Sequence, residues 1–333
     1  MKDVKAAPPP ATRGPFSAAD AAFTGFRVLR REPVTGAIWA AAMLGMGLVF
    51  GALAVLLAGS AMGELMQRAG DPQSDPAAAA ALMGRLAPFY FVVFILSFLF
   101  YAVAISAVTR AVLRPDEPRG FGRLRLGGDE LRMLGVLLLF AVVSFAAYVV
   151  LVILAVIVGV VGGVAVGLSA ASAGGGAAAG GVVLMTILIG LAVFAGMAFL
   201  TVRLSLACPL TFDTGQVDLF GSWRLTKGRF WPLFGAYALC FLLALVLTLA
   251  AFMIMAVLGL VLGGGLAAAG VMFRPDTSSL GAYFAPLMLL WFVISSALNT
   301  VVLAMLFAAP AGAYAQLRTA AGTTAVIPPT RGF

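Results

Sequence analysis

Few side chains in this sequence could carry out chemistry, because the 333-residue chain has no histidine and only two cysteines. Without histidine there is no imidazole to bind a metal ion, act as a general base or complete a serine–histidine–aspartate triad. Cys208 and Cys240 are too few for a disulfide framework, and we interpret them as packing residues. The adjacent carboxylates Asp129 and Glu130 would point to different faces of a helix, so we interpret them as first-turn acids. We therefore expect no catalytic residue, no metal site, no cofactor and no enzymatic activity.

Basic and aromatic residues gather in two polar stretches, residues 110–132 and 203–235, a pattern typical of surfaces that contact anionic lipid headgroups. The candidate contacts are Arg123, Arg125, Arg132, Trp223, Arg224, Lys227, Arg229 and Trp231. The second stretch could also be a connector that only sets the angle of the following span. In that stretch we expect a turn at 211–215, a helix over 216–227, a helix stop at Gly228 and a helix start near Pro232.

Uncharged polar residues fall inside the apolar runs, and the candidates for a polar cluster are Tyr148, Ser295, Ser296 and Asn299. Ser295 and Asn299 are four residues apart and share a helix face. The cluster would either line a path for a solute or form hydrogen bonds between helices, each worth about 0.6 kcal/mol. All 13 carboxylates are expected in loops or tails. Arg110 and Arg203 are expected at span ends, within reach of headgroups.

The composition requires a membrane around these residues. Hydrophobic residues make up 62% of the chain and charged residues 10%, whereas soluble domains carry about 25% charged residues. The predicted fold class is therefore all-α: a polytopic bundle of six transmembrane helices with short interfacial amphipathic helices. We attribute the net charge of +8 to basic loops beside anionic lipid, not to nucleic acid. The expected partner is the lipid bilayer, and the sequence identifies no protein partner.

Apolar runs predict six spans, at about 36–59, 87–113, 133–160, 182–207, 233–263 and 284–309. Loops are expected at 60–86, 114–132, 169–181 and 264–283. The loop at 169–181 is glycine-rich, and Pro310 is expected to close the last span.

The two ends of the chain flank a predicted membrane domain over 16–315. Residues 1–15 are rich in proline and alanine and are expected to be a disordered tail, and residues 316–333 a second tail. A helix is expected over 16–31, with Ser17 and Asp20 in a capping-box pattern. Its apolar arc contains Phe16, Ala19, Phe23, Phe26 and Leu29. The helix would lie in the membrane interface or pack on the loops.

Basic residues are distributed unevenly about these spans. Of the 21 Lys and Arg residues, 18 fall in the N-terminal segment, the 110–132 and 203–232 regions and the C-terminal tail. The other three are Arg68, Arg85 and Arg274. The positive-inside rule then places both termini in the cytoplasm.

The polar stretches also carry a family resemblance. RLSLACP at 203–209 and GSWRLTKGRFWPLFG at 221–235, with RAVLRP at 110–115 and RLRLGGDELR at 123–132, resemble a group of bacterial six-span proteins. That group is the glycerophosphoryl diester phosphodiesterase membrane-domain family, and the resemblance covers about residues 16–315. It implies a multi-pass protein of the bacterial inner membrane. Some relatives carry a soluble phosphodiesterase domain that uses histidines and acidic metal ligands. This chain has no histidine, so the resemblance implies no catalytic residue here.

The function expected from these patterns is that of a non-enzymatic envelope protein, acting as an accessory, a scaffold or a lipid-interacting element. The alternative is a transporter or channel for a small or lipid-like solute, which would need a continuous polar path between the spans.

Overall fold

The computed structural model describes residues 16–68, 76–173, 175–261 and 276–321. These residues form helices with short connections, and no strand occurs among them. Within this part, six helices are long and apolar enough to cross a membrane. They are α3 (Pro33–Arg68), α4 (Pro76–Leu113), α5 (Gly128–Ala173), α6 (Gly175–Leu204), α9 (Phe230–Gly259) and α12 (Pro286–Ala321). The predicted all-α polytopic membrane fold is confirmed. The predicted tail 1–15, and residues 322–333 of the other tail, lie outside the described residues.

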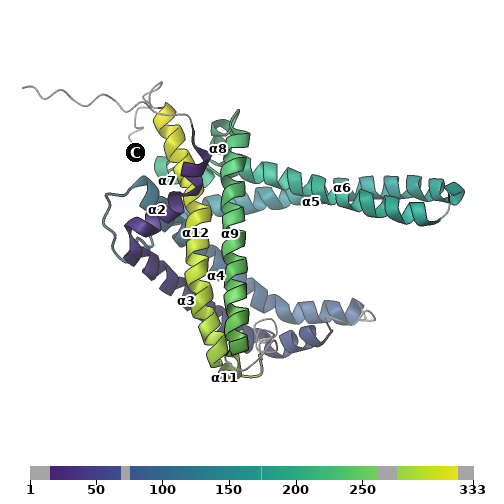
Figure 1. The fold of residues 1–333 in the computed structure, drawn as a ribbon, viewed down its shortest axis with the longest axis horizontal. Helices are drawn as coiled ribbons and strands as arrows, with labels where there is room; N and C mark the ends of the chain where they lie inside the picture. Colours follow the sequence, from purple (N-terminus) through teal and green to yellow (C-terminus); the bar gives the residue numbers. More distant parts are fainter. Residues whose placement is uncertain (1–15, 69–75, 174, 262–275, 322–333) are drawn as a thin grey trace, which may run out of the picture.

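The long helices pair as three hairpins, α3 with α4, α5 with α6, and α9 with α12. Figure 1 shows the hairpins diverging from one end of the molecule, with α5 and α6 extending away from α9 and α12. α12 connects two hairpins because it also packs on α3 and α4, and α4 packs on α5. No residue in the most apolar stretches of α5 and α6 is buried. These two helices therefore present apolar side chains to their surroundings along these stretches.

Short segments hold the converging ends of the hairpins together. They are α1 (Ala18–Ala22), α2 (Thr24–Arg31), the connection 114–127, α7 (Ala207–Thr214) and α8 (Leu219–Leu225). We call residues 16–32, 114–127 and 205–229 the hub. α1 and α2 pack on α12, α7 packs on α5, and α8 packs on α6. The short helix α11 (Leu280–Tyr283) lies at the opposite end and packs on α3.

Two of the predicted loops are largely helical. α3 continues to Arg68 and α4 begins at Pro76, while α5 and α6 are separated only by residue 174. Alanine is the best helix former, so these alanine-rich stretches extend the helices beyond the ~20 residues that a bilayer requires.

The end of the last span also differs from the prediction. Pro310 lies inside α12, which runs on to Ala321 and so crosses the boundary predicted at residue 315. A proline removes one backbone hydrogen bond, and a membrane helix tolerates this loss where neighbouring groups pack around it.

The predicted helix over 16–31 is two short helices that break at Phe23. Ser17 caps α1 as predicted, its Oγ accepting from the Asp20 N–H at 3.2 Å. The apolar arc predicted for this helix differs from the face that is buried in the structure: Phe23, a member of the predicted arc, is 41% exposed. The buried residues of α1 and α2 are mostly small: Ala21, Ala22, Thr24, Gly25 and Val28. Small residues let α2 approach α12 closely.

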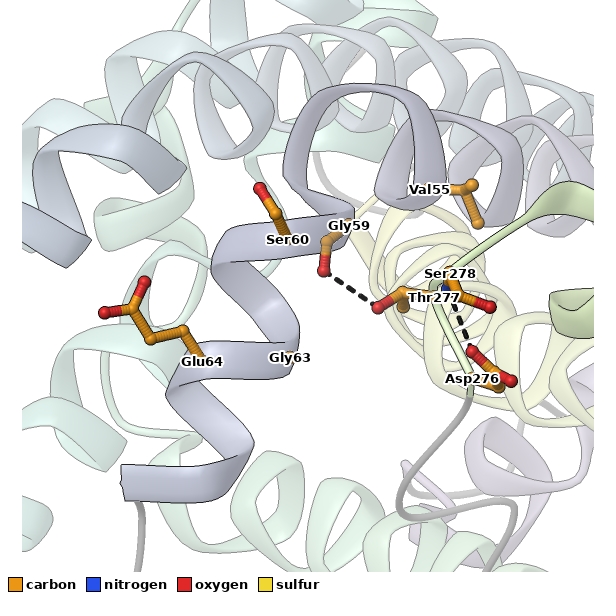
Figure 2. A pocket seen from close by; sticks show the side chains of 8 residues that line it. All are labelled: Val55, Gly59, Ser60, Gly63, Glu64, Asp276, Thr277 and Ser278. Carbon is orange, nitrogen blue, oxygen red and sulfur yellow. Dashed lines mark hydrogen bonds between the residues drawn. The ribbon is translucent and has the colours of Figure 1, made fainter.

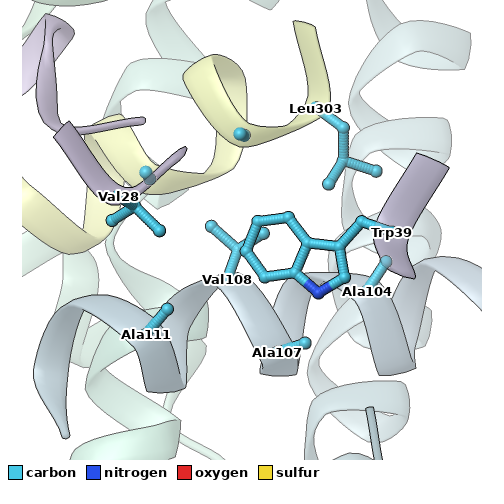
Figure 3. Close-up of a cluster of buried hydrophobic side chains, with 9 residues drawn as sticks. Val28, Trp39, Ala104, Ala107, Val108, Ala111 and Leu303 are labelled. Carbon is cyan, nitrogen blue, oxygen red and sulfur yellow. The ribbon is translucent and has the colours of Figure 1, made fainter. Parts of the chain in front are cut away.

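A cluster of buried apolar side chains links the hub to the spans, as Figure 3 shows. Trp39 of α3 packs with Val28 of α2, Val108 of α4 and Leu303 of α12. The Trp39 indole N–H donates to the carbonyl of Gly122 at 2.7 Å. One aromatic ring thus joins four helices and the 114–127 connection, which fixes the start of α3 against the hub.

Candidate lipid headgroup site

Arg123, predicted to contact lipid headgroups, is instead buried in the hub, with a side chain 0% exposed. It donates from Nε to Glu32 Oε2 at 3.1 Å and from Nη2 to Glu32 Oε1 at 3.0 Å. It also donates to the carbonyls of Arg114 and Pro115 at 3.0 and 2.9 Å. The backbone of Arg123 has a φ of 60°, in the left-handed region that costs an L-residue energy. This paired geometry ties the 114–127 connection to the α2–α3 junction, and burial keeps the guanidinium away from lipid.

Arg110, expected to reach headgroups from the end of its span, is also buried, at 1% exposed. It donates to Glu130 Oε1 at 2.5 Å and to the Arg123 carbonyl at 2.8 Å, and it lies 3.8 Å from Asp129 Oδ2. The neighbouring carboxylates Asp129 and Glu130 therefore both face one guanidinium, although adjacent positions on a helix diverge. Both carboxylates reach Arg110 because they lie in the first turn of α5, and the last turn of α4, which carries Arg110, lies beside that turn.

Arg125 and Arg132 are exposed, with side chains 51% and 48% accessible, but both are paired. Arg125 pairs with Glu117, and Arg132 pairs with Asp129 at 3.1 Å. A cation that already faces a carboxylate gains less from a lipid phosphate than an unpaired cation does. These two residues reach the surface but contribute little net positive charge to it.

Acid is expected to weaken the hub through Glu32. Burial raises the pKa of this carboxyl, but hydrogen bonds and charge from Arg123, with Thr35 and Arg31, outweigh burial and hold the pKa below its ordinary value. A depressed pKa contributes stability that is complete above the unfolded pKa of about 4.3 and is lost as the pH falls through the folded value. As the pH is lowered below about 4.3, the melting temperature of the purified protein should decrease. It should fall less steeply in Glu32→Gln, and an equal slope in both proteins would contradict the assignment.

The other predicted stretch forms a compact corner between α6 and α9. The expected turn at 211–215 is the end of α7, and Gly215 follows it with a φ of 70°. Asp218 caps α8, which is shorter than the predicted helix over 216–227. Gly228 has a φ of 75°, and α9 starts at Phe230 with Pro232 in its first turn, as predicted. These turns direct the chain from α6 back into the membrane.

Hydrogen bonds fix α8 against the end of α6. Ser222 Oγ donates to the Arg203 carbonyl at 2.8 Å, and Thr226 Oγ1 lies 3.3 Å from the same oxygen. Ser222 Oγ also accepts from the Leu206 N–H at 3.1 Å. Both hydroxyl residues are buried. α8 is therefore held rigidly enough to position the side chains on its outer face.

An aromatic cluster holds Arg203 at this corner. Its guanidinium carbon lies 5.2 Å from the Phe199 ring centroid and 5.4 Å from the Trp223 ring centroid. Phe199 also contacts Phe230, at a centroid distance of 5.3 Å, and Phe230 contacts Trp231 at 5.3 Å. The Arg203 Nε and Nη1 atoms are buried and have no hydrogen-bond partner among the described residues. Arg203 was expected to reach headgroups from the end of its span but was not among the candidate contacts, although its spacing of four from Phe199 is a helical one.

Positive charge at the corner is not balanced by the carboxylates nearby. Asp213 pairs with Arg318 at 2.6 Å, and Asp218 pairs with Arg224 at 3.4 Å. Within the described part of the chain, Arg203, Lys227 and Arg229 form no ion pair. Arg224 is 82% accessible, so its pair is weak. Trp231 is 75% exposed and Trp223 is 38% exposed. We call the set Arg203, Trp223, Arg224, Lys227, Arg229 and Trp231 the cationic corner.

The predicted polar cluster inside the spans does not assemble. Tyr148 is half exposed on the outside of α5. Ser295 and Ser296 donate to carbonyls of their own helix, those of Phe292 and Val293, at 3.2 and 2.8 Å. Asn299 lines a cavity of about 630 Å³ between α3, α4, α5 and α12, and the other three predicted residues do not line this cavity.

A second hollow of about 570 Å³ lies at the opposite end from the hub, between α3 and the chain before α11 (Figure 2). Thr277 Oγ1 donates to the Gly59 carbonyl at 2.9 Å, and the Ser278 N–H donates to Asp276 Oδ1 at 2.9 Å. Glu64 faces this hollow but also pairs with Arg85 at 2.7 Å. These contacts fasten the far end of α3 and engage both carboxylates of the hollow, Glu64 through Arg85 and Asp276 through the Ser278 N–H.

The cationic corner can bind oxyanions through guanidinium and ammonium groups, while its indoles suit the boundary between headgroups and acyl chains. The chain matches no protein-family model, no curated protein and no solved structure.

Proposed function

We propose that this protein is a non-enzymatic, lipid-interacting element of the bacterial inner membrane that binds anionic lipid headgroups at the cationic corner. The observation that carries the proposal is the uncompensated charge of the exposed residues Lys227 and Arg229 beside two exposed indoles. Arg203 adds positive charge behind them, against the Phe199 and Trp223 rings. A basic residue near an anionic surface gains about 1 kcal/mol. The arginines of the α4–α5 region lack this capacity because carboxylates already neutralise them.

The proposed orientation has both termini and the hub in the cytoplasm. The excess of basic residues at the hub end of the spans supports it, since the positive-inside rule counts Lys and Arg in short loops. In this orientation the cationic corner faces the leaflet whose anionic lipids attract basic segments. The motifs at 203–209 and 221–235 also support kinship with the glycerophosphoryl diester phosphodiesterase membrane-domain family, without its soluble catalytic domain.

Neutralising the corner should remove a preference for anionic lipid. In the triple variant Arg224→Gln, Lys227→Gln, Arg229→Gln, we expect phosphatidylglycerol binding to weaken by up to about 3 kcal/mol, at ~1 kcal/mol for each basic residue. Phosphatidylcholine binding should not change, because it carries no net charge. The measurement is the dissociation constant of each fluorescent lipid for the full-length protein in non-ionic detergent. The wild-type preference should also decline with added salt, which screens exposed charges.

A matched control distinguishes local charge from net charge. The variant Arg125→Gln, Arg132→Gln removes two exposed arginines that are paired with Glu117 and Asp129. It should bind phosphatidylglycerol almost as tightly as the wild type. Equal binding of the two lipids by the wild-type protein, or equal losses in both variants, would contradict a headgroup site at the corner.

The alternative function, transport of a small or lipid-like solute, has one observation in its favour, the cavity that Asn299 lines between α3, α4, α5 and α12. The polar path that transport would need is not assembled by Tyr148, Ser295 and Ser296. We therefore retain lipid binding as the conclusion and consider the cavity separately.

A further inference from the structure

The cavity between four long helices is large and mostly apolar. Its volume of about 630 Å³ lies within the range of roughly 300–1,000 Å³ typical of small-molecule sites. α3 contributes Met43 and Phe50, α4 contributes Phe100, and α12 contributes Leu306 and Phe307. All four helices are candidate membrane spans. An apolar space of this size among spans is suited to a hydrocarbon chain.

Three polar groups face this cavity without a partner. Asn299 of α12, Ser97 of α4 and Tyr101 of α4 line it, and their side-chain polar atoms form no hydrogen bond within the described residues. Asn299 is exposed and lies near the middle of α12. In a bilayer core, an amide without a hydrogen-bond partner is costly because no water replaces the missing bond. A ligand with one hydrogen-bonding group would remove that cost.

No charged side chain lines the cavity among the residues that the structure describes. The nearest cation along α4, Arg110, is one turn beyond Ile105, and it is already engaged by Glu130 and the Arg123 carbonyl. A charged ligand placed in this space would lose its hydration without gaining a partner of opposite charge. The lining therefore favours an uncharged ligand.

We propose that this cavity binds an uncharged lipid-like molecule, with an apolar chain along α3, α4 and α12 and a single neutral hydrogen-bonding group, such as an alcohol or ester carbonyl, at Asn299. The proposal does not depend on the cationic corner, which lies at the ends of α6 and α9 and binds by charge. The two sites differ in ligand class: the corner takes anionic headgroups, and the cavity takes neutral chains.

Photolabelling of the full-length protein in lipid nanodiscs tests the proposal. The probes are diazirine analogues of hexadecanol, which is neutral, and of hexadecyl sulfate, which is anionic. We expect the alcohol probe to label peptides that contain Ser97–Ile105 and Asn299–Phe307, and unlabelled hexadecanol to compete with this labelling. Hexadecyl sulfate should label the same peptides at least about tenfold less, the penalty for an unpaired charge exceeding ~1.4 kcal/mol.

Three variants separate a binding site from a damaged fold. Ala141 lines the cavity, and Ala141→Phe should reduce the competed labelling by about tenfold or more because the ring occupies the ligand's space. The matched control, Ala146→Phe, adds the same ring at an exposed position of α5 and should leave labelling unchanged. Asn299→Leu keeps the side-chain size and should weaken the alcohol by about three- to tenfold, the value of one hydrogen bond.

Labelling that unlabelled hexadecanol does not reduce would mean that bulk bilayer lipid merely fills the space, and it would overturn the proposal. Equal labelling by the two probes, or equal labelling in Ala141→Phe and Ala146→Phe, would also overturn it. Loss of labelling in Asn299→Leu, with normal melting behaviour, would support the assignment of the polar group to Asn299.

Discussion

Replacing Arg123 by methionine is expected to lower the free energy of unfolding by about 3–5 kcal/mol, because removal of one partner strands a buried charge. Arg123 donates twice to Glu32, and both side chains are almost fully buried. Methionine fills similar space but leaves the Glu32 carboxylate without its main partner. The residue also closes the 114–127 connection through the carbonyls of Arg114 and Pro115. Chemical or thermal unfolding of the full-length protein in detergent would measure the loss.

Two further variants make this expectation specific. Arg125→Met removes an exposed arginine from a pair with Glu117 and should cost no more than about 1 kcal/mol, as exposed pairs do. The double variant Arg123→Met, Glu32→Leu should recover most of the loss, because an apolar pair of similar volume replaces a buried ion pair at little cost. A double variant as unstable as Arg123→Met alone would show that the ion pair is not the origin of the effect.

Replacing Gly25 by leucine should separate α1 and α2 from the spans. A Cβ at this position would lie 2.4 Å from the Ala304 carbonyl oxygen and 2.7 Å from the Met305 Cα, both backbone atoms of α12. Backbone atoms cannot rotate away, so α2 must move outward. Glycines on both helices permit this close approach of α2 and α12, since a Cβ on Gly312 of α12 would lie 2.4 Å from Thr24 Oγ1 of α2. Overpacking of this kind typically costs about 1–3 kcal/mol or more.

A native cysteine reports this movement. Cys240 of α9 is 1% exposed, and its Sγ lies 3.7 Å from the Ala22 carbonyl of α1. In Gly25→Leu, we expect a maleimide to modify Cys240 under conditions that leave the wild type unmodified, with peptide mass spectrometry distinguishing Cys240 from Cys208. The control Gly45→Leu adds the same side chain where no atom lies within 4 Å. If Cys240 stayed unreactive in Gly25→Leu, α1 would not depend on the close approach of α2 and α12.

These two expectations concern one feature, the dependence of the diverging hairpins on the hub. The α5–α6 hairpin joins the rest of the molecule near the hub, and beyond it α5 and α6 pack chiefly on each other. The other two hairpins also contact each other along α3 and α12. The Arg123–Glu32 pair joins segments 91 residues apart, and the α2–α12 contact joins opposite ends of the chain. The cationic corner is built on this same hub, so its geometry depends on both contacts.

Hydropathy in the sequence was enough to determine the all-α membrane fold and the number of spans, because each apolar run must satisfy its own backbone as a helix in lipid. Local residue types were enough to predict three features: the helix cap at Ser17, the end of a helical segment at Gly228 and the start of α9 near Pro232. Helix lengths were underestimated at 60–86 and 169–181, since alanine-rich segments continue a helix beyond the bilayer without any apolar signal.

Only the tertiary structure decided which polar residues are available for function. In sequence, Arg123 and Lys227 are equivalent, each a basic residue in a short loop between spans. The fold brings Glu32 to Arg123 from 91 residues away and brings no carboxylate to Lys227 within the described chain. The same holds for Asn299, which differs from Ser295 in facing a cavity lined by four separate helices. A charge or an amide is available for binding only if no other group of the protein already pairs with it. Which distant residues become its neighbours depends on how the helices pack, and residue type and local spacing do not reveal that packing.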